Sequence, residues 1–234
     1  MKILVVNPNT TASMTAKIGA CARIAANSGT EIIARNPASG PVSIEGHYDE
    51  AISTAGLLEE IQRGEAEGMD GFVVACFDDP AIGACRELAT GPVLGICEAA
   101  MRVASMIATS FSVVTTLPRS IPIIEDLALR YGLERRCRRV RAVDLPVLAF
   151  EDDPDARHRM LSEVQAAVAE DRCEAIILGC AGMADLTDWL SHEAGLPVID
   201  GVVAGVRLVE ALAGAGLKTS KIGAYAMPRK KHIA

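Results

Sequence analysis

The chain has 234 residues, half of them apolar, and a formal net charge of −7. The apolar share is enough for a substantial core, while the negative charge argues against nucleic acid or an anionic membrane surface as a partner. The longest uncharged stretch, residues 103–118, is too short to cross a bilayer, and because the chain opens directly on a strand pattern we expect no signal peptide. Seven cysteines without disulfide-like spacing indicate a reduced, cytoplasmic protein.

Short β-branched runs alternate with helical patterns along the whole chain. The predicted strands are ILVV (3–6), EIIA (31–34), FVVA (72–75), PVLGI (92–96), FSVV (111–114), RVRAV (139–143), AIIL (175–178) and PVI (197–199). The first helical pattern places four residues on one face, namely Met14, Ile18, Cys21 and Ala25. Further helices are predicted over 154–170 and 202–214. This alternation predicts an α/β protein with parallel sheets covered by helices on both faces.

The pattern is duplicated. Cys76 ends one apolar run and Cys180 ends another, and 180 − 76 = 104. Two further pairs of landmarks keep nearly the same offset: Pro92 and Pro197 (197 − 92 = 105), and Asn7 and Thr115 (115 − 7 = 108). The chain therefore reads as two copies of one unit of about half its length.

We expect two pseudo-symmetric, flavodoxin-like domains of four parallel strands each, with the active site in the cleft between them. The first half comprises 1–97 plus 212–234 and the second comprises 98–211, the helix at 202–214 running back to the first unit. Ligands of such sheets bind beyond the carboxyl ends of the strands, which is where both cysteines are predicted to lie.

The two cysteines are the candidate catalytic groups. Two thiols facing each other across a pseudo-twofold axis suit removal and return of a proton on opposite faces of one carbon. Asp-Asp-Pro after Cys76 is a helix start signal, and a thiol at a helix N-terminus has its thiolate favoured by the dipole. Asp78 and Asp79 oppose this, since nearby carboxylates disfavour a second negative charge. The backbone N–H groups of Phe77 and Ala181 are candidates to hold a developing enolate oxygen.

The other polar and sulfur-containing residues have ordinary structural explanations. Asn7, Thr115 and Thr116 lie at strand ends, where turn chemistry and substrate contact are equally good interpretations. Packing explains the five other cysteines, at 21, 85, 97, 137 and 173. Helix capping or a loop position explains three more residues, namely His47, Glu98 and Asp200.

No sequence pattern points to a cofactor. The chain has no C-x-x-C, no H-E-x-x-H and neither of the glycine-rich nucleotide motifs. Lysine is absent from residue 18 to residue 217, which removes the usual anchor for pyridoxal phosphate. We therefore expect chemistry carried out by side chains alone.

Six stretches together resemble the hydantoin racemase group, which includes allantoin racemases, of the aspartate/glutamate/hydantoin racemase superfamily. They are VVNPNTTASM (5–14), EGHYDEA (45–51), VVACFDDP (73–80), FSVVTTLPRS (111–120), ILGCAGM (177–183) and PVIDGV (197–202). The resemblance implies two similar α/β domains, an active site between them, no cofactor, and Cys76 and Cys180 as paired acid and base. Arylmalonate decarboxylases of the superfamily keep only the second cysteine, and maleate isomerases carry different surrounding motifs. Ala81 departs from the group, where glycine is frequent at this position.

We therefore predict a cofactor-independent racemase of 5-substituted hydantoins, allantoin included. Asn7, Phe77, Thr115, Thr116 and Ala181 are the predicted substrate-binding residues, and the partner is a small cyclic ureide. The alternatives are an amino-acid racemase acting on aspartate or glutamate and a non-catalytic protein that binds a ureide in its cleft. The absence of Arg or Lys inside either cysteine motif favours a neutral ring over a dicarboxylate. We also expect a homo-oligomer.

Overall fold

The computed structural model describes residues 1–149 and 153–229, giving only the backbone of residues 184 and 185. In this part of the chain eight strands form two parallel sheets of four. The first sheet contains β1 (Lys2–Val6), β2 (Glu31–Arg35), β3 (Gly71–Val74) and β4 (Val93–Gly95), and the second contains β5 (Phe111–Thr115), β6 (Cys137–Ala142), β7 (Ala175–Leu178) and β8 (Val198–Ile199). All eight predicted strands are present, with ends that differ by at most two residues.

The two sheets have the same strand order, which confirms the duplication and the predicted fold class. The orders are β2-β1-β3-β4 and β6-β5-β7-β8, so each strand of the first sheet has its counterpart four places later. In register, Val6 of β1 lies beside Val74 of β3, and Val114 of β5 lies beside Leu178 of β7. The carboxyl ends of the two central strands of each sheet therefore reach one edge together, and the residues that follow them share that edge.

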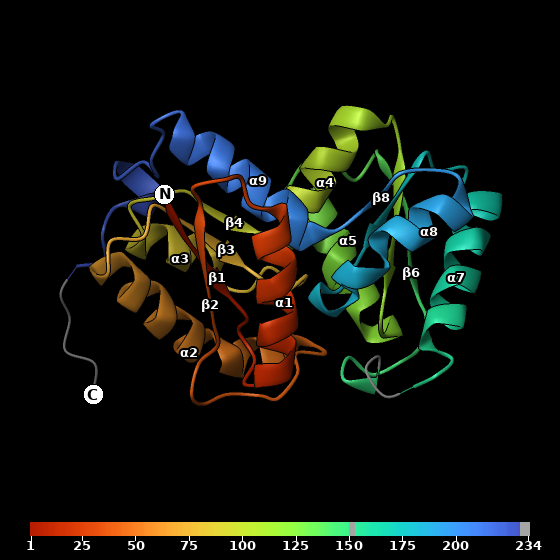
Figure 1. Ribbon diagram of the computed structural model, residues 1–234, viewed down its shortest axis with the longest axis horizontal. Helices are drawn as coiled ribbons and strands as arrows, with labels where there is room; N and C mark the ends of the chain where they lie inside the picture. Colours follow the sequence, from red (N-terminus) through yellow and green to blue (C-terminus); the bar gives the residue numbers. More distant parts are fainter. Residues whose placement is uncertain (150–152, 230–234) are drawn as a thin grey trace.

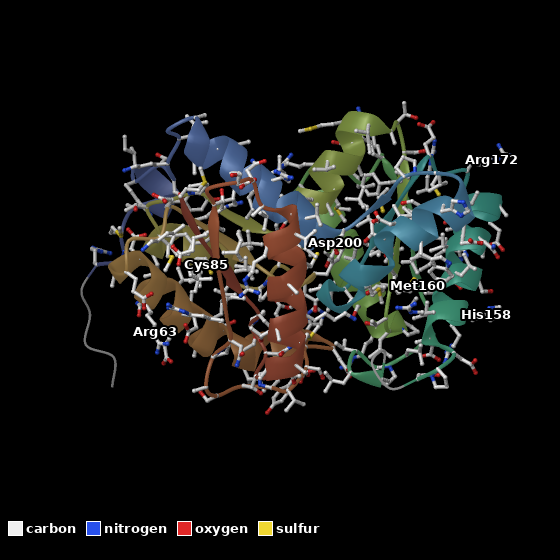
Figure 2. All side chains as sticks on the ribbon, in the orientation of Figure 1. Arg63, Cys85, His158, Met160, Arg172 and Asp200 are labelled. Carbon is white, nitrogen blue, oxygen red and sulfur yellow. The ribbon has the colours of Figure 1, made fainter. Side chains whose placement is uncertain are left out.

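Helices connect the strands and cover both faces of each sheet. The strands of the first sheet are followed in the chain by α1 (Ala12–Ala25), α2 (His47–Ala66), α3 (Ile82–Leu88) and α4 (Ile96–Ile107). Those of the second are followed by η1 (Pro118–Ser120), α5 (Ile121–Arg130), α7 (Ala156–Asp171), η2 (Ala181–Leu186), α8 (Thr187–Ala194) and α9 (Gly201–Gly214), and η3 (Gly223–Tyr225) lies in the tail. The helix predicted over 154–170 is α7, and Figure 2 shows its Met160 turned inward and its His158 turned outward.

The helix that follows the last strand of each sheet packs on the other sheet. Helix α9 packs on β3 and β4 of the first sheet, as predicted, and α4 packs on β7 and β8 of the second (Figure 1). The approach of α9 is close, because a Cβ on Gly71 of β3 would lie 2.3 Å from Val209. The tail stays with the first half, where the N–H of Thr219 donates to the carbonyl of Thr90 over 3.0 Å. The exact division at 97/98 and 211/212 stays a prediction.

The core continues from one sheet to the other. Its main cluster contains Val5 and Val73 of the first sheet together with Val113 and Ile177 of the second, and a smaller cluster lies under α2 and α3. All seven cysteines are free thiols, and Figure 2 places Cys85 inside the first half. Within the described part of the chain, no helix combines the length and the apolar character needed to span a membrane.

Candidate active site

Cys76 and Cys180 occupy equivalent positions, each two residues after the third strand of its own half. Both lie at the start of the same kind of turn: the carbonyl of Cys76 accepts from the N–H of Asp79 over 3.1 Å, and that of Cys180 accepts from Met183 over 3.3 Å. The sulfur atoms also share a pattern, because the N–H two residues later hydrogen-bonds each of them, from Asp78 and from Gly182. The duplicated sequence thus builds two matching thiol sites.

Both thiols open into one cavity of about 30 Å³ between the two halves. Its lining includes all seven residues that the sequence predicted for the site, namely Asn7, Cys76, Phe77, Thr115, Thr116, Cys180 and Ala181. The catalytic and substrate-binding roles of these residues stay predictions. The cavity is small and partly open to solvent.

Sequence reasoning missed several lining residues, among them Asn9, Met14, Ile44, Asp78, Ser120 and Val147. Ile44 and Val147 form apolar walls from loops that follow the second strand of each half, and 147 − 44 = 103, close to the offset of the cysteines. In the sequence, this offset is the feature that could have linked Ile44 with Val147. The two loops are joined across the cavity, because the Glu45 carboxylate accepts from the N–H of Val147 over 3.0 Å.

The segment after Cys76 differs from the expectation. Asp-Asp-Pro predicted a helix start, but α3 begins only at Ile82, and a turn intervenes in which Asp79 and Ala81 have φ of 45° and 51°. Left-handed conformations are costly for residues with a Cβ, and such strain concentrates at functional sites. The frequent glycine of the resembled group fits the conformation that Ala81 adopts here.

Asp79 serves the fold. Its carboxylate accepts from the N–H groups of Cys97 and Glu98 over 3.0 and 2.8 Å, and from the Tyr131 hydroxyl over 2.6 Å. It therefore caps helix α4 from the preceding loop, and it packs so closely that a Cβ on Gly95 would lie 2.1 Å from its Oδ1. Burial raises the pKa of Asp79 to about 7, while the three donors act in the opposite direction.

The capping role expected for Glu98 was wrong. Its carboxylate instead pairs with Arg86 over 2.7 Å and with Arg102 over 2.8 Å, because Asp79 already occupies the N–H groups at the start of α4. The capping role expected for Asp200 is confirmed, since its Oδ1 accepts from the N–H of Val203 over 2.8 Å at the start of α9. Figure 2 shows Asp200 where the chain passes from the second half toward the first.

Burial dominates the acidity of both site thiols. It raises the pKa of Cys76 well above its ordinary 9.0, and the neighbouring charge of Asp78 adds to that effect. Burial raises the pKa of Cys180 to about 11, although the hydrogen bond from the N–H of Gly182 favours the thiolate and acts in the opposite direction. Each thiolate would also disfavour ionisation of its counterpart in the same cavity, since Cys180 raises the pKa of Cys76. The helix-terminus effect expected from the sequence is thus outweighed, and the resting site holds two neutral thiols.

The polar residues at the strand ends are partly committed to the fold. The Asn7 amide donates to Asn9 Oδ1 over 2.8 Å and to Thr15 Oγ1 over 3.0 Å, which fixes the loop before α1. The Thr115 hydroxyl donates to the carbonyl of Gly179 over 2.9 Å, so toward a ligand it can only accept. Thr116 is buried and also lines the cavity.

The lining contains no lysine, arginine or histidine among the described residues, and Asp78 is its acidic side chain. Arg119 lies outside it, against Gly46. His47 begins α2 with a side chain 78% exposed, which agrees with a cap or loop position. In residues 1–149 and 153–229, no three His, Cys, Asp or Glu side chains gather as the ligands of a metal ion would.

Comparison with known proteins confirms the resemblance seen in the sequence. The family described as Asp/Glu/Hydantoin racemase matches residues 3–209. The hydantoin racemase of Rhizobium meliloti is 56% identical over 235 residues, covering 100% of this chain and 98% of the relative, and that of Pseudomonas sp. (strain NS671) is 51% identical over 232 residues, covering 99% and 93%. The solved structure of allantoin racemase from Klebsiella pneumoniae is 51% identical, covers 100% of this chain and 96% of its own, and superposes with a TM-score of 0.98. The chain belongs to the Asp/Glu/hydantoin racemase family and is an isomerase.

Proposed function

We propose that this enzyme is a cofactor-independent racemase of 5-substituted hydantoins, allantoin included, in which Cys76 and Cys180 exchange the proton of the ring carbon. One observation carries the proposal: two thiols from equivalent strand ends open into a single cavity that holds no cationic side chain among its described lining residues. The relatives at 56% and 51% identity are hydantoin and allantoin racemases, which supports the same substrate class.

The chemistry requires one thiolate and one thiol. The thiolate removes the proton from the carbon beside the ring carbonyl, giving a planar enolate, and the opposite thiol then delivers its own proton to the other face. The two cysteines end with exchanged protonation states, so each enantiomer uses the opposite starting form. The raised pKa values make the thiolate scarce but strongly basic, which suits removal of a proton from carbon.

Backbone groups are the proposed donors to the substrate oxygens. Neither the N–H of Phe77 nor that of Ala181 donates to another described residue, and both residues line the cavity. Such fixed donors stabilise the charge that develops on an enolate oxygen. Thr115, whose own hydrogen is committed, is suited to accept from a ring N–H, with Thr116 and Asn7 completing the polar wall.

The cavity disfavours the main alternative, a racemase of aspartate or glutamate. Those substrates carry two carboxylates, and cationic partners would stabilise such a pair of negative charges best in a buried site. The described lining offers none and includes the carboxyl group of Asp78 instead. A neutral ring with N–H donors and carbonyl acceptors fits this lining better.

Single cysteine substitutions test the mechanism. Cys76→Ser and Cys180→Ser should each abolish racemisation, because a hydroxyl is too weak an acid to replace the missing thiol. Each variant keeps one cysteine, so it should exchange deuterium from solvent into one enantiomer of 5-benzylhydantoin, with opposite preferences in the two variants. Cys85→Ser, in a cysteine buried away from the cavity, is the control and should racemise normally. Exchange of the same enantiomer by both variants would contradict the two-cysteine mechanism, and no exchange by the wild type on any hydantoin would contradict the substrate class.

Homo-oligomerisation is also proposed, through an apolar groove of about 670 Å³ between α1, α4, α8 and α9. Ile24, which is 86% exposed, lines this groove together with Asp188 and Arg207. In a twofold contact the same surface of each copy faces the other. A protruding apolar side chain, a groove and charges of both signs on one face can therefore complement each other between two copies. Ile24→Glu should lower the mass measured by light scattering, and an unchanged mass would exclude this face.

A reducing, cytoplasmic location stays a prediction that the seven free thiols favour.

A further inference from the structure

Two adjacent aspartates after Cys76 have opposite environments. Asp79 turns away from the cavity and has three hydrogen-bond donors on its carboxylate. Asp78 lines the cavity beside both cysteines. Asp79 adopts a left-handed conformation in the turn that carries both residues.

The carboxyl group of Asp78 is buried without compensation. The residue is 7% exposed, and its Oδ2 has no hydrogen-bond partner among the described residues. The charged groups that act on it are Glu50, which repels a negative charge, and His47, which attracts one, both in the first turn of α2. A buried polar atom without a partner lowers stability, so its presence beside a reactive site calls for a partner that arrives with the ligand.

We propose that Asp78 is a specificity-determining residue whose carboxylate accepts a hydrogen bond from a ring N–H of the bound substrate. The proposal rests on the proposed function, since a cyclic ureide carries an N–H group on either side of one of its carbonyls. It explains why a carboxylate faces a cavity without cations: the ligand is expected to supply a donor rather than a negative charge. Thr115, which can only accept, provides a second position for the other ring N–H.

Methylated substrates isolate this contact. 5-Benzylhydantoin and its N1-methyl and N3-methyl derivatives are compared in the wild type, in Asp78→Leu, which keeps the shape and removes the acceptor, and in Asp78→Asn, which keeps one acceptor oxygen. Methylation at the nitrogen that faces Asp78 should lower kcat/KM of the wild type at least about tenfold, because it leaves a buried acceptor unpaired. In Asp78→Leu this preference should fall to within about twofold, and Asp78→Asn should retain part of it.

The readout separates this role from a structural one and from the proposed function itself. Damage to the fold would lower kcat/KM for all three substrates alike, and it is checked by urea unfolding of both variants. An unchanged N–H preference in Asp78→Leu for both nitrogens, with hydantoins still racemised, would overturn the role of Asp78 alone. A wild type that racemises none of the substrates would overturn the proposed function, and ligand-induced shifts in melting temperature would then decide the role of Asp78 without turnover. If the ligands shift the melting temperatures of the wild type and Asp78→Leu equally, or shift neither, the role of Asp78 would be overturned as well.

Discussion

The adjacent aspartates test the energetics of the site, because both are buried but, within the described part of the chain, only Asp79 has hydrogen-bond donors on its carboxylate. Burial raises the pKa of Asp78 from its ordinary 3.8 to about 7, so the folded protein keeps a proton that the unfolded chain has lost. Between these two values the free energy of unfolding falls as pH rises, and it stays reduced above the folded pKa. At about 1.4 kcal/mol per pKa unit, the full effect of ionising this group is roughly 4 kcal/mol.

Asp78→Asn removes the titration, so the variant should be more stable than the wild type by an amount that grows with pH. The difference should increase by about 2–3 kcal/mol between pH 5 and pH 8, from the same pKa values. Urea unfolding at several pH values, followed by circular dichroism, measures it. Asp79→Asn is the matched control: its pKa is also about 7, so the same pH-dependent gain is expected, but the amide replaces one of the two oxygens that receive three donors. At every pH the Asp79→Asn variant should therefore be less stable than Asp78→Asn by about 1–3 kcal/mol. A stability difference for Asp78→Asn that does not depend on pH would refute the reasoning.

Three further predictions follow from the loops and thiols. Ala81→Gly should raise the free energy of unfolding by about 0.5–1 kcal/mol, because glycine adopts the left-handed conformation without the strain of an alanine. Ala84→Gly, inside α3, should lower it by a similar amount. Urea unfolding measures both changes, and changes of the same sign in the two variants would contradict this account. Glu45→Ala removes the hydrogen bond to Val147 that joins the two loops, and alkylation of the site thiols, followed by mass spectrometry, should become about tenfold faster; an unchanged rate would show that this bond does not limit entry. Alkylation of Cys180 should keep rising by about tenfold per pH unit up to about pH 10, and a plateau near pH 9 would mean that burial does not raise its pKa.

Most of the fold could be predicted from the sequence, because the patterns that indicate strands and helices are local and occur twice. Each predicted run forms one parallel strand, and the constant offset alone pairs Cys76 with Cys180. The different environments of Asp78 and Asp79 could not be predicted, since the two residues lie in an irregular turn whose sequence indicates a helix start. Ile44 and Val147 lie in loops without periodicity, where only the offset between the halves links them.

The exchange of α4 and α9 between the sheets limits how the enzyme can move. A wide hinge motion would pull each helix off the apolar face that it covers, and would expose part of the core that runs through both halves. We therefore expect substrate entry to depend on the loops that carry Ile44 and Val147, which line the cavity and are held together through Glu45. The same exchange ties the two sheets into one cooperative unit, so the chain should unfold in a single transition, although it is built from two copies of one unit.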